Sequence, residues 1–386
     1  MNQFKNMTFY EHMNNYVYLI DKSTSSDEVK ISDIEFINDE VRNAVVKLKN
    51  DIPHDDSWDH AKRKINEYEN IFSSAKKPLK ICKKRSLSRA YFKLWEILYD
   101  FHPQIFSKFR KLNTAHLAEG PGGFIECLID YKNKFNINIK QIFGITLLVQ
   151  SGTDNRVPFW KLSKDICVSN NVSINRRNDN IGDLYDFRCI NNFVNRVGYN
   201  SCELVTADGG FDFSTDFNSQ EKTFQRLFLS ELYTAAQIQR IGGTFIIKVF
   251  DMFTIETSCL VSILYELYDK IYIIKPFTSR PANSEKYLMC LNYLHSNKNL
   301  SLLNDCKNEI LNNNGIMKAL GKYLNKDVAN RLCVYNTYYA SRQMFYLDKT
   351  LKEANLREYD RNKADTFEKA KKKCIDWCDH YELDHV

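Results

Sequence analysis

The sequence contains no long apolar run. None of its segments approaches the roughly 20 consecutive apolar residues that cross a bilayer, so a membrane-spanning protein is excluded and no membrane partner is expected. Residues 1–16 lack both the basic start and the apolar centre of a secretory signal. We therefore expect a soluble protein that stays inside the cell.

No framework of closely spaced cysteines is present either. The eleven cysteines are scattered through segments that read as core, which is typical of a reducing compartment where thiols pack as small apolar groups. Cys374, Cys378 and His380 lie close together, but a zinc site needs about four ligands and no second Cys/His cluster lies nearby. We expect a helix with two half-buried cysteines there, and neither a disulfide nor a metal site.

An excess of charge of one sign is also lacking. The formal net charge of +6 permits an anionic partner without requiring one. Clustered cations are typical of phosphate-binding surfaces, although a solvated face is the alternative. The cations gather at the approach to a predicted helix, and they are Lys76, Lys77, Lys80, Lys83, Lys84, Arg85 and Arg89.

What the chain does contain divides into three parts. With 386 residues and a hydrophobic content of 44%, the chain is long enough to bury a sizeable core. Residues 1–79 show helical periodicity, residues 80–297 alternate between apolar strands and helices, and residues 298–386 are polar and helical. Because no repeat or low-complexity linker separates these parts, we expect the C-terminal part to pack on the central one.

The central part predicts a mostly parallel α/β sheet. Strands that alternate with helices favour such a sheet with helices on both faces, and it binds ligands at the carboxyl ends of its strands. Helices are indicated over residues 87–101, 124–131 and 220–240. Strands are indicated just before the turn at 118–123 and within residues 139–148, 172–174, 203–207, 244–250, 271–275 and 286–291.

A glycine turn follows the first apolar strand of this part. In HLAEGPGGF, residues 116–124, the strand runs into the turn and then into the start of a helix. Glycines allow positive φ and let a ligand approach the backbone, and the amides that open a helix carry partial positive charge. We interpret the turn as a cofactor site, although a turn that binds nothing would leave the same local pattern.

Three charged residues lie at or near the ends of predicted strands: Glu119, Asp208 and Lys248. Lys248 stands in a buried strand, where an unpaired ammonium is costly, so it marks a candidate site. A lysine that snorkels to solvent or pairs with a structural carboxylate is the alternative. Lys93 lies off the apolar stripe of its helix and close to Glu96, and an ordinary surface ion pair would also explain it.

Several separated stretches together resemble one family. They are SRAYFKLWEI at residues 88–97, AEGPGGF at 118–124, ADGGF at 207–211, GTFIIKVFDMF at 243–253 and FTSRPANSEKY at 277–287. In this order, and over about residues 80–295, they resemble the FtsJ-type ribose 2'-O-methyltransferases. The resemblance implies a Rossmann-like class I fold with a mostly parallel seven-stranded sheet and S-adenosylmethionine as the cofactor. The helical extensions on both sides are expected from periodicity and composition alone.

The family's signature is a Lys-Asp-Lys-Glu tetrad, and the matching positions are Lys93, Asp208, Lys248 and Glu285. An amine can assist the weakly nucleophilic 2'-hydroxyl by accepting its proton or by stabilising the alkoxide, and the sequence leaves open which of these Lys248 does. The turn departs from the GxGxxG dinucleotide pattern. The resemblance implies cofactor contacts at Ser88, Glu119, Gly120, Pro121, Gly122, Gly123, Phe124, Asp183 and Asp208.

Within the family, TSRPANSE at residues 278–285 is most similar to enzymes of eukaryotes and large DNA viruses that methylate the first transcribed nucleotide of capped mRNA. The implied substrate is the 5' end of capped mRNA, and other capping or transcription proteins are further candidate partners. Cations and polar side chains contact phosphate and sugar. The RNA contacts that we expect are Lys84, Arg85, Arg89, Ser279, Arg280 and Asn283.

Two other functions stay open at this point. One is a ribosomal or transfer RNA ribose 2'-O-methyltransferase, and the other is a catalytically idle RNA-binding subunit of a capping complex, against which the intact tetrad argues. The abundance of Asn, Ile, Lys and Tyr indicates an AT-rich genome and favours a large cytoplasmic virus. We therefore expect the protein in the cytoplasm, in a viral factory or a virion, with the nucleus as the alternative location.

Overall fold

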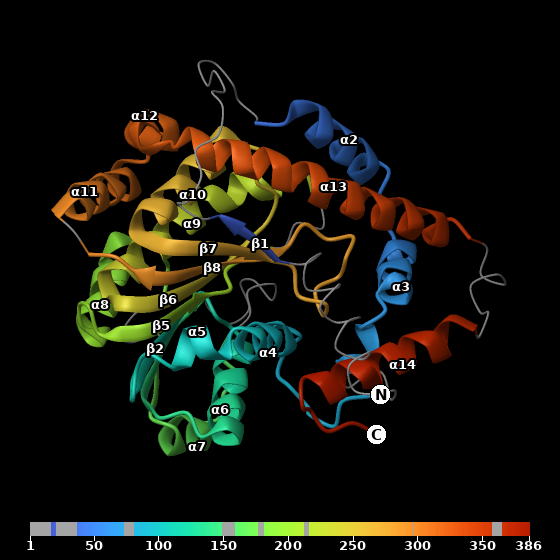
Figure 1. The fold of residues 1–386 in the computed structure, drawn as a ribbon, viewed down its shortest axis with the longest axis horizontal. Helices are drawn as coiled ribbons and strands as arrows, with labels where there is room; N and C mark the ends of the chain where they lie inside the picture. Colours follow the sequence, from blue (N-terminus) through green and yellow to red (C-terminus); the bar gives the residue numbers. More distant parts are fainter. Residues whose placement is uncertain are drawn as a thin grey trace.

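A single β-sheet forms the centre of the fold. The structure is a computed structural model, and it describes residues 17–20, 37–72, 81–148, 159–176, 181–211, 216–295, 297–356 and 365–386. Within these residues the sheet has eight strands in the order β1-β7-β8-β6-β5-β2-β3-β4. Helices cover both faces of the sheet (Figure 1).

The strands confirm the expected α/β architecture. Strands β2 (Leu112–Leu117), β3 (Ile139–Ile145), β4 (Val172–Ile174), β5 (Cys202–Ala207) and β6 (Gln239–Val249) are parallel. Strand β8 (Lys286–Tyr293) runs antiparallel between β6 and β7 (Tyr268–Ile274). Strand β1 (Val17–Ile20) is an addition to the seven expected strands and pairs antiparallel with β7. We expected only helices in this part of the chain, because a strand of four residues is too short to show a period.

The expected helices over residues 87–101, 124–131 and 220–240 correspond to α4, α6 and α9. Helix α9 ends at Ile238, so β6 begins earlier than residue 244. The helical elements are α2 (Asp39–Asn50), α3 (Asp56–Ile65), η1 (Glu69–Ile71), α4 (Ala90–Asp100), α5 (His102–Phe106), α6 (Gly123–Phe135), α7 (Lys164–Ser169), α8 (Phe187–Val197), α9 (Gln220–Ile238), α10 (Ile255–Leu267), α11 (Asn297–Asn312), α12 (Ile316–Leu320), η2 (Gly321–Tyr323), α13 (Lys326–Ala354) and α14 (Asp365–His380).

Strand β6 explains on which face of the sheet the charged residues gather. Phe245, Ile247 and Val249 pack into the core with α9 and α10, whereas Ile246 packs into the core with α4 and α6. Successive side chains of a strand point to opposite faces, so Lys248 shares the face of Ile246. Lys248 lies one residue before the carboxyl end of β6, and it is therefore directed to the edge of the sheet beside α4.

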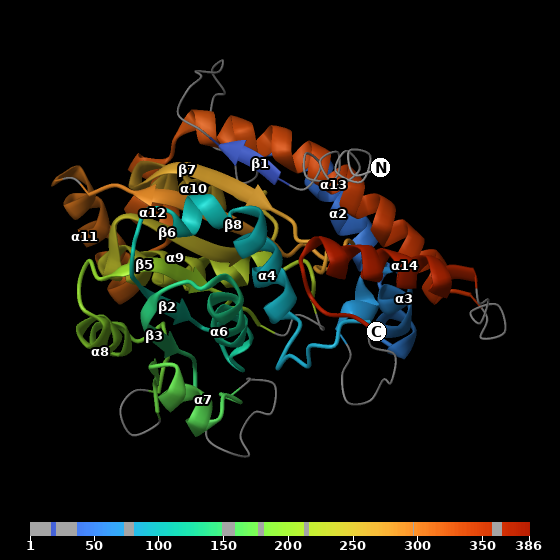
Figure 2. The ribbon, with the colours of Figure 1, turned by 60° about the horizontal axis from the view of Figure 1, so that its bottom comes forward.

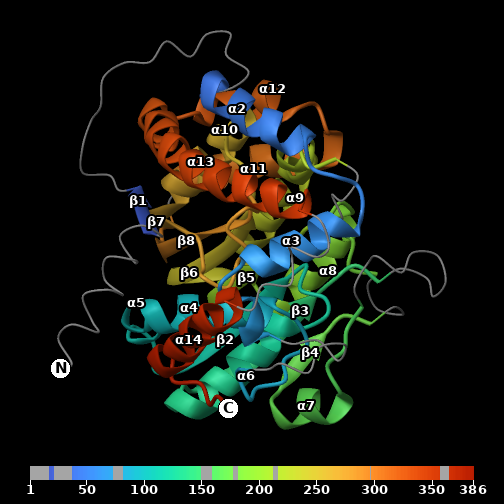
Figure 3. The same ribbon diagram turned by 90° about the vertical axis from the view of Figure 1, so that its right-hand side faces the viewer.

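The helices from the two ends of the chain pack on each other and on the central part. Helices α2 and α3 pack against α13 around Val45, Trp58 and Leu347 (Figure 3). Helix α14 lies beside α4 (Figure 2), where the indole N–H of Trp95 donates to the carbonyl oxygen of Tyr381 at 2.9 Å. The C-terminal part thus packs on the sheet domain as expected, and the boundaries near residues 79 and 297 stay predictions.

All eleven cysteines lie in the described residues, and each is a free thiol. Cys374 and Cys378 are fully buried; the prediction that they are half-buried was wrong, because α14 is covered by α4 and η1. Among the described residues, no group of three or more His, Cys, Asp or Glu side chains is arranged to hold a metal ion. None of the helices described has both the length and the apolar character needed to span a membrane.

Candidate active site

Four charged side chains from four elements meet at the carboxyl edge of β5 and β6. Lys93 on α4 forms an ion pair with Glu285, which lies just before β8, and Lys93 Nζ is 2.7 Å from Glu285 Oε1. Lys248 Nζ donates to the carbonyl oxygen of Asp208 at 2.7 Å and lies 3.2 Å from Asp208 Oδ1. The side chains are only 10% to 14% exposed, so the cluster is close to dry.

The fold dictates this meeting. Asp208 directly follows β5 and Lys248 is the last residue but one of β6, and the carboxyl ends of these parallel neighbours lie at one edge of the sheet. Strand β8 is antiparallel to β6, so its start lies at the same edge, and Glu285 immediately precedes it. Lys93 reaches the edge from α4, whose buried Leu94 and Leu98 fix the helix on the sheet.

The charges in the cluster stabilise each other. Burial opposes ionisation of Glu285, but the ammonium groups of Lys93, Lys248 and Lys275 together hold the pKa of its carboxyl far below its usual value. Burial also disfavours the charged form of Lys248. The carboxylates of Asp208 and Glu285 more than compensate, and the pKa of the Lys248 amine is raised above its ordinary value. Lys248 is therefore an ammonium at neutral pH.

Two further side chains complete the cluster, and the sequence reasoning missed their part in it. The hydroxyl of Tyr287 donates to Asp208 Oδ1 at 2.9 Å, and the hydroxyl of Ser279 donates to Glu285 Oε1 at 2.8 Å. Tyr287 stands opposite Lys248 in the ladder of β6 and β8. The sequence could not indicate this, because β8 is buried on both faces and shows no alternation, so only its pairing with β6 places Tyr287 on the side of Lys248.

A buried acid lies behind this cluster. Glu231 on α9 is fully buried, and its carboxylate lies against the backbone of Gly209 with no ion-pair partner in the described structure. Burial raises the pKa of this carboxyl well above its usual value, while the nearby charge of Lys248 opposes the shift. The signal for it in the sequence was an acid among the apolar residues Leu227, Phe228 and Leu232, which should be costly to bury.

The glycine turn between β2 and α6 is held by hydrogen bonds within the protein. Gly122 adopts a φ of 112°, and the carbonyl oxygen of Glu119 accepts its N–H at 2.8 Å. Glu119 Oε1 accepts the N–H of Phe124 at 2.5 Å, and the N–H of Gly120 donates to Thr146 Oγ1 at 3.0 Å. Glu119 is therefore a residue that shapes the turn, and burial raises the pKa of its carboxyl well above the usual value.

A cleft of about 830 Å³ opens in front of the turn and ends at the charged cluster. Of the expected cofactor contacts, Ser88, Gly120, Pro121, Asp183 and Asp208 line it. Gly123 and Phe124 are buried behind it, and a Cβ at Gly123 would lie 2.2 Å from Ser88 Oγ. The residues that line the cleft include Thr146, Leu147, Leu184, Tyr185, Phe211 and Lys248, which the sequence reasoning did not assign to it as cofactor contacts.

This cleft fits an extended cofactor such as S-adenosylmethionine. Its volume lies within the range of about 300 to 1,000 Å³ that small-molecule sites occupy. Ser88 Oγ is buried and has no hydrogen-bond partner in the part of the chain that the structure describes, so a polar group of a ligand could satisfy it. The carboxylate of Asp183 lies on the same wall, where its Oδ1 accepts the N–H of Tyr185 at 2.8 Å.

Most of the side chains that we expected to contact RNA instead contact other groups of the protein. Lys84 forms ion pairs with two acids of α6, and Arg89 and Arg280 share Glu69, at 2.8 Å and 3.0 Å. Their partners on η1 and α6 were not recognisable from sequence, because they are remote along the chain. The carboxamide oxygen of Asn283 accepts the N–H of Glu285. Arg85 is exposed and has no ion-pair partner in the described ranges; Lys76, Lys77 and Lys80 lie outside the described residues.

A second cavity lies on the other side of the loop that carries Glu285. Its volume is about 120 Å³. Trp58 and Phe217 contribute aromatic surface, and Lys62 and Arg280 contribute positive charge. The walls come from α2, α3, α13 and the residues before β8 and α9, so both ends of the chain take part in building it.

Comparison with known proteins relates this chain to a methyltransferase family. A family model described as FtsJ-like methyltransferase matches residues 86–293. The chain is 32% identical over 245 residues to cap-specific mRNA (nucleoside-2'-O-)-methyltransferase 2 of Drosophila melanogaster, which covers 61% of this chain and 34% of that protein. It is 30% identical over 183 residues to cap-specific mRNA (nucleoside-2'-O-)-methyltransferase 1 of Trypanosoma cruzi, which covers 47% of this chain and 48% of that protein.

The chain thus spans between about a third and a half of the length of these two relatives. Among solved structures, a 1,6-didemethyltoxoflavin-N1-methyltransferase of Burkholderia thailandensis superposes with a TM-score of 0.30 and 11% sequence identity. The superposition covers 54% of this chain and 80% of that one.

Proposed function

This chain belongs to the FtsJ-like methyltransferase family, and from this membership we propose that it methylates the ribose 2'-oxygen of the first transcribed nucleotide of capped mRNA. The observation that carries the proposal is the meeting of Lys93, Asp208, Lys248 and Glu285 beside a cleft of cofactor size. The cap as the substrate is supported by the relatives, whose names give cap-specific mRNA as what they act on.

S-adenosylmethionine, when bound, supplies a methyl group on a sulfonium that a nucleophile can displace. Ser88, Gly120 and Pro121 are proposed to hold the cofactor at the glycine turn, and Asp183 to hold its other end. Asp208 lines the cleft and also contacts Lys248, so it is the residue at which the cofactor site and the charged cluster join.

Lys248 acts in this proposal as an ammonium group. Its raised pKa keeps it protonated at neutral pH. Nζ donates one N–H to the Asp208 carbonyl oxygen, and a fixed ammonium with further donors can orient the ribose hydroxyl and stabilise negative charge that develops on its oxygen. Lys93 Nζ lies 2.7 Å from Glu285 Oε1, so Lys93 neutralises the carboxylate of Glu285 and holds it in place. In this arrangement Lys248 orients the hydroxyl and stabilises its oxygen, and the proton that the hydroxyl loses passes to solvent water.

The second cavity is proposed to receive a part of the RNA 5' end. An aromatic surface from Trp58 and Phe217 suits a base. Lys62 and Arg280 are ion-paired with Asp59 and Glu69, and their remaining N–H donors suit phosphate. The cavity borders Asn283 and Ser284, next to Glu285 in the chain, so a nucleotide bound there would be near the charged cluster. A cytoplasmic site of action, a viral source, and capping or transcription proteins as partners stay predictions.

Replacement of Lys248 by Ala tests the proposed mechanism. We expect methyl transfer to a short capped RNA to fall by about 10² to 10⁴-fold, the range in which a positioned proton or charge donor contributes. Cofactor binding, measured by calorimetry, should change by less than about threefold, because the cleft is lined mainly by other residues. Lys270→Ala, which removes an exposed lysine of β7, is the matched control. Persistent methyl transfer in Lys248→Ala would contradict the mechanism.

A further inference from the structure

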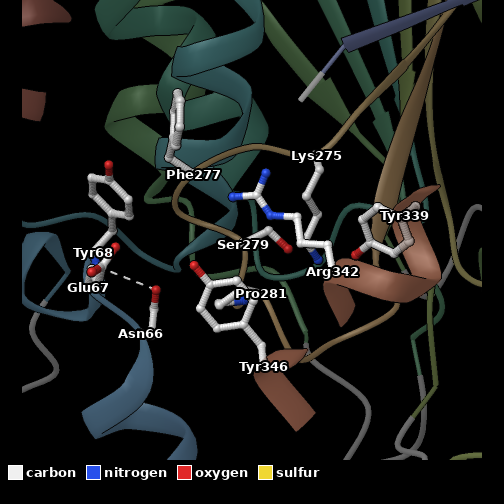
Figure 4. Close-up of a pocket in the computed structure, with 10 residues that line it drawn as sticks. All are labelled: Asn66, Glu67, Tyr68, Lys275, Phe277, Ser279, Pro281, Tyr339, Arg342 and Tyr346. Atoms are coloured by element: carbon white, nitrogen blue, oxygen red, sulfur yellow. Dashed lines mark hydrogen bonds between the residues drawn. The ribbon is translucent and has the colours of Figure 1, made fainter. Parts of the chain in front are cut away.

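Helix α13 lies outside the region that matches the family, yet it contacts the loop that carries Glu285. The family match ends at residue 293, and α13 begins at Lys326. The loop is residues 276–285, between β7 and β8. Figure 4 shows Tyr339 and Arg342 of α13 close to Lys275 and Ser279 of the loop region, and all four line a small cavity.

Direct hydrogen bonds connect the helix to the backbone of the loop. The hydroxyl of Tyr339 donates to the carbonyl oxygen of Asn283 at 3.0 Å, and the carboxamide of Gln343 donates to the carbonyl oxygen of Ala282 at 3.4 Å. Lys275 Nζ donates to the same Asn283 carbonyl at 2.8 Å and to the Glu285 carbonyl at 2.7 Å. The Asn283 carbonyl thus accepts two hydrogen bonds, one of them from α13.

The ring of Tyr339 also contacts the next residue of the catalytic segment. Lys286 Nζ lies 4.2 Å from the centre of the ring, within the distance of a cation–π interaction. Tyr335, one turn earlier on α13, stacks on Tyr339 with ring centres 5.6 Å apart and planes 11° apart. Tyr339 is 7% exposed, so both contacts lie in a region that excludes most water.

The position of Asn283 affects the charged cluster directly, because Asn283 is hydrogen-bonded to Glu285. The carboxamide oxygen of Asn283 accepts the N–H of Glu285 at 2.5 Å, and Glu285 holds Lys93 through its carboxylate. The cavity of Figure 4 has a volume of about 20 Å³, enough for one water molecule and too small for a nucleotide. The contact between α13 and the loop is therefore a packing contact with no ligand between its parts.

We propose that Tyr339 is a positioning residue for Glu285, and that the C-terminal extension thereby sets the geometry of the active site. The hydroxyl fixes the backbone at Asn283, and the ring fixes Lys286, on either side of Glu285. The consequence for turnover rests on the proposed function; the consequence for the loop does not.

Tyr339→Phe removes the hydroxyl and keeps the ring. We expect kcat for capped RNA to fall about three- to tenfold, as for the loss of one hydrogen bond, with the KM for the cofactor unchanged. Tyr339→Leu removes both contacts, and we expect a loss of about 100-fold. Tyr338→Phe, which removes a hydroxyl from the exposed face of the same helix, is the control and should stay within about twofold.

Hydrogen exchange gives a readout that needs no turnover. The amide of Glu285, which donates to the Asn283 side chain, should exchange faster in Tyr339→Phe than in the wild type and at an unchanged rate in Tyr338→Phe. Unchanged kcat together with unchanged exchange in Tyr339→Phe would overturn the inference. If the wild type does not methylate capped RNA while Tyr339→Phe loosens the Glu285 amide, the proposed function fails and the positioning role stands. Tyr339→Phe tests the positioning role of Tyr339 even if Tyr339→Leu does not fold.

Discussion

Gly209 is a residue at which the active site has no room for a side chain. It follows Asp208, and a Cβ at this position would lie 2.2 Å from Glu231 Oε1 and 2.7 Å from Leu227 Cδ2. The buried carboxyl of Glu231 therefore lies directly against the backbone that carries Asp208. Any side chain at Gly209 has to displace either the acid or the turn.

Gly209→Ala is expected to reduce both stability and activity. Overpacking of a dense site costs about 1 to 3 kcal/mol, and the displaced turn carries Asp208, which Lys248 and Tyr287 contact. Thermal unfolding and methyl transfer would be measured together. Gly321→Ala is the control, because its nearest neighbour is the flexible end of Met317 at 3.2 Å. Equal stability and activity in the two variants would show that the turn has more freedom than the structure implies.

Lys286 gives the stability of the protein a pH dependence with a definite sign. Burial lowers the pKa of its amine to about 8, although Asp251, at 3.8 Å, opposes the shift. The charged form is thus disfavoured in the folded state, and the resulting penalty is fully present below about pH 8. It is relieved as the pH rises from about 8 towards the ordinary pKa of 10.5.

We therefore expect the wild type to gain stability relative to Lys286→Met between pH 8 and 10.5, by the order of 1 to 3 kcal/mol. Chemical denaturation of both proteins at several pH values measures the difference. Because the other titrating groups are common to both proteins, they cancel. Lys270→Met, which changes an exposed lysine, should show no such trend. A difference that is constant with pH would mean that Lys286 titrates normally.

At the scale of elements, α2 is attached to the end of β6 by a buried ion pair. Lys49 Nζ lies 2.5 Å from Asp251 Oδ2, and the two side chains are 6% and 9% exposed. Asp251 comes three residues after Lys248, so the N-terminal extension holds the chain just beyond the active site. The N-terminal extension thus contacts the chain after β6 through α2, as the C-terminal extension contacts the loop before β8 through α13.

Lys49→Met should destabilise the protein by about 3 kcal/mol, because removal of one partner leaves a buried carboxylate that is only partly compensated by Lys286. Lys47→Met on the exposed face of the same helix is the control and should have an effect below about 0.5 kcal/mol. Urea denaturation gives both values. If Lys49→Met is no more destabilising than Lys47→Met, the extension does not support β6 through this pair.

The elements of the central part were predictable from sequence, and the extensions were less so. The apolar run around Lys248 and the glycine turn at Gly122 are local patterns, so the strand and the turn follow from them. Strand β1 and the pairing of Glu69 with Arg89 and Arg280 depend on contacts between remote segments. Periodicity contains no information on such contacts, which is why cations that we expected to face RNA instead face an acid.

Local patterns were also insufficient for some of the charged residues of the site. The resemblance to the family supplied Lys93 and Glu285, which the pattern of their own segments left ambiguous. The structure brings them together at 2.7 Å. It also adds Tyr287, which only the pairing of β6 with β8 assigns to the site. The sign of the pKa shift of Lys248 depends on the balance between burial and its acidic neighbours, and that balance needs coordinates.

At the scale of the whole molecule, both ends of the chain contact the same edge of the sheet. Helices α2 and α3 lie with α13 across the region next to the end of β6 and the loop before β8 (Figure 3). The second cavity is formed between these helices and the loop. The extensions therefore contribute walls on the side where the RNA is proposed to bind, while the cofactor cleft is built by the central part together with Phe72.

The most direct test of the proposed function is to locate the methyl group that the protein adds. Short RNAs with and without a 5' cap are incubated with the protein and S-adenosylmethionine, digested, and analysed by mass spectrometry. We expect one added methyl on the ribose 2'-oxygen of the first transcribed nucleotide, in the capped RNA alone. Equal methylation of the uncapped RNA, a methyl at an internal position or on a base, or no methyl at all would contradict it.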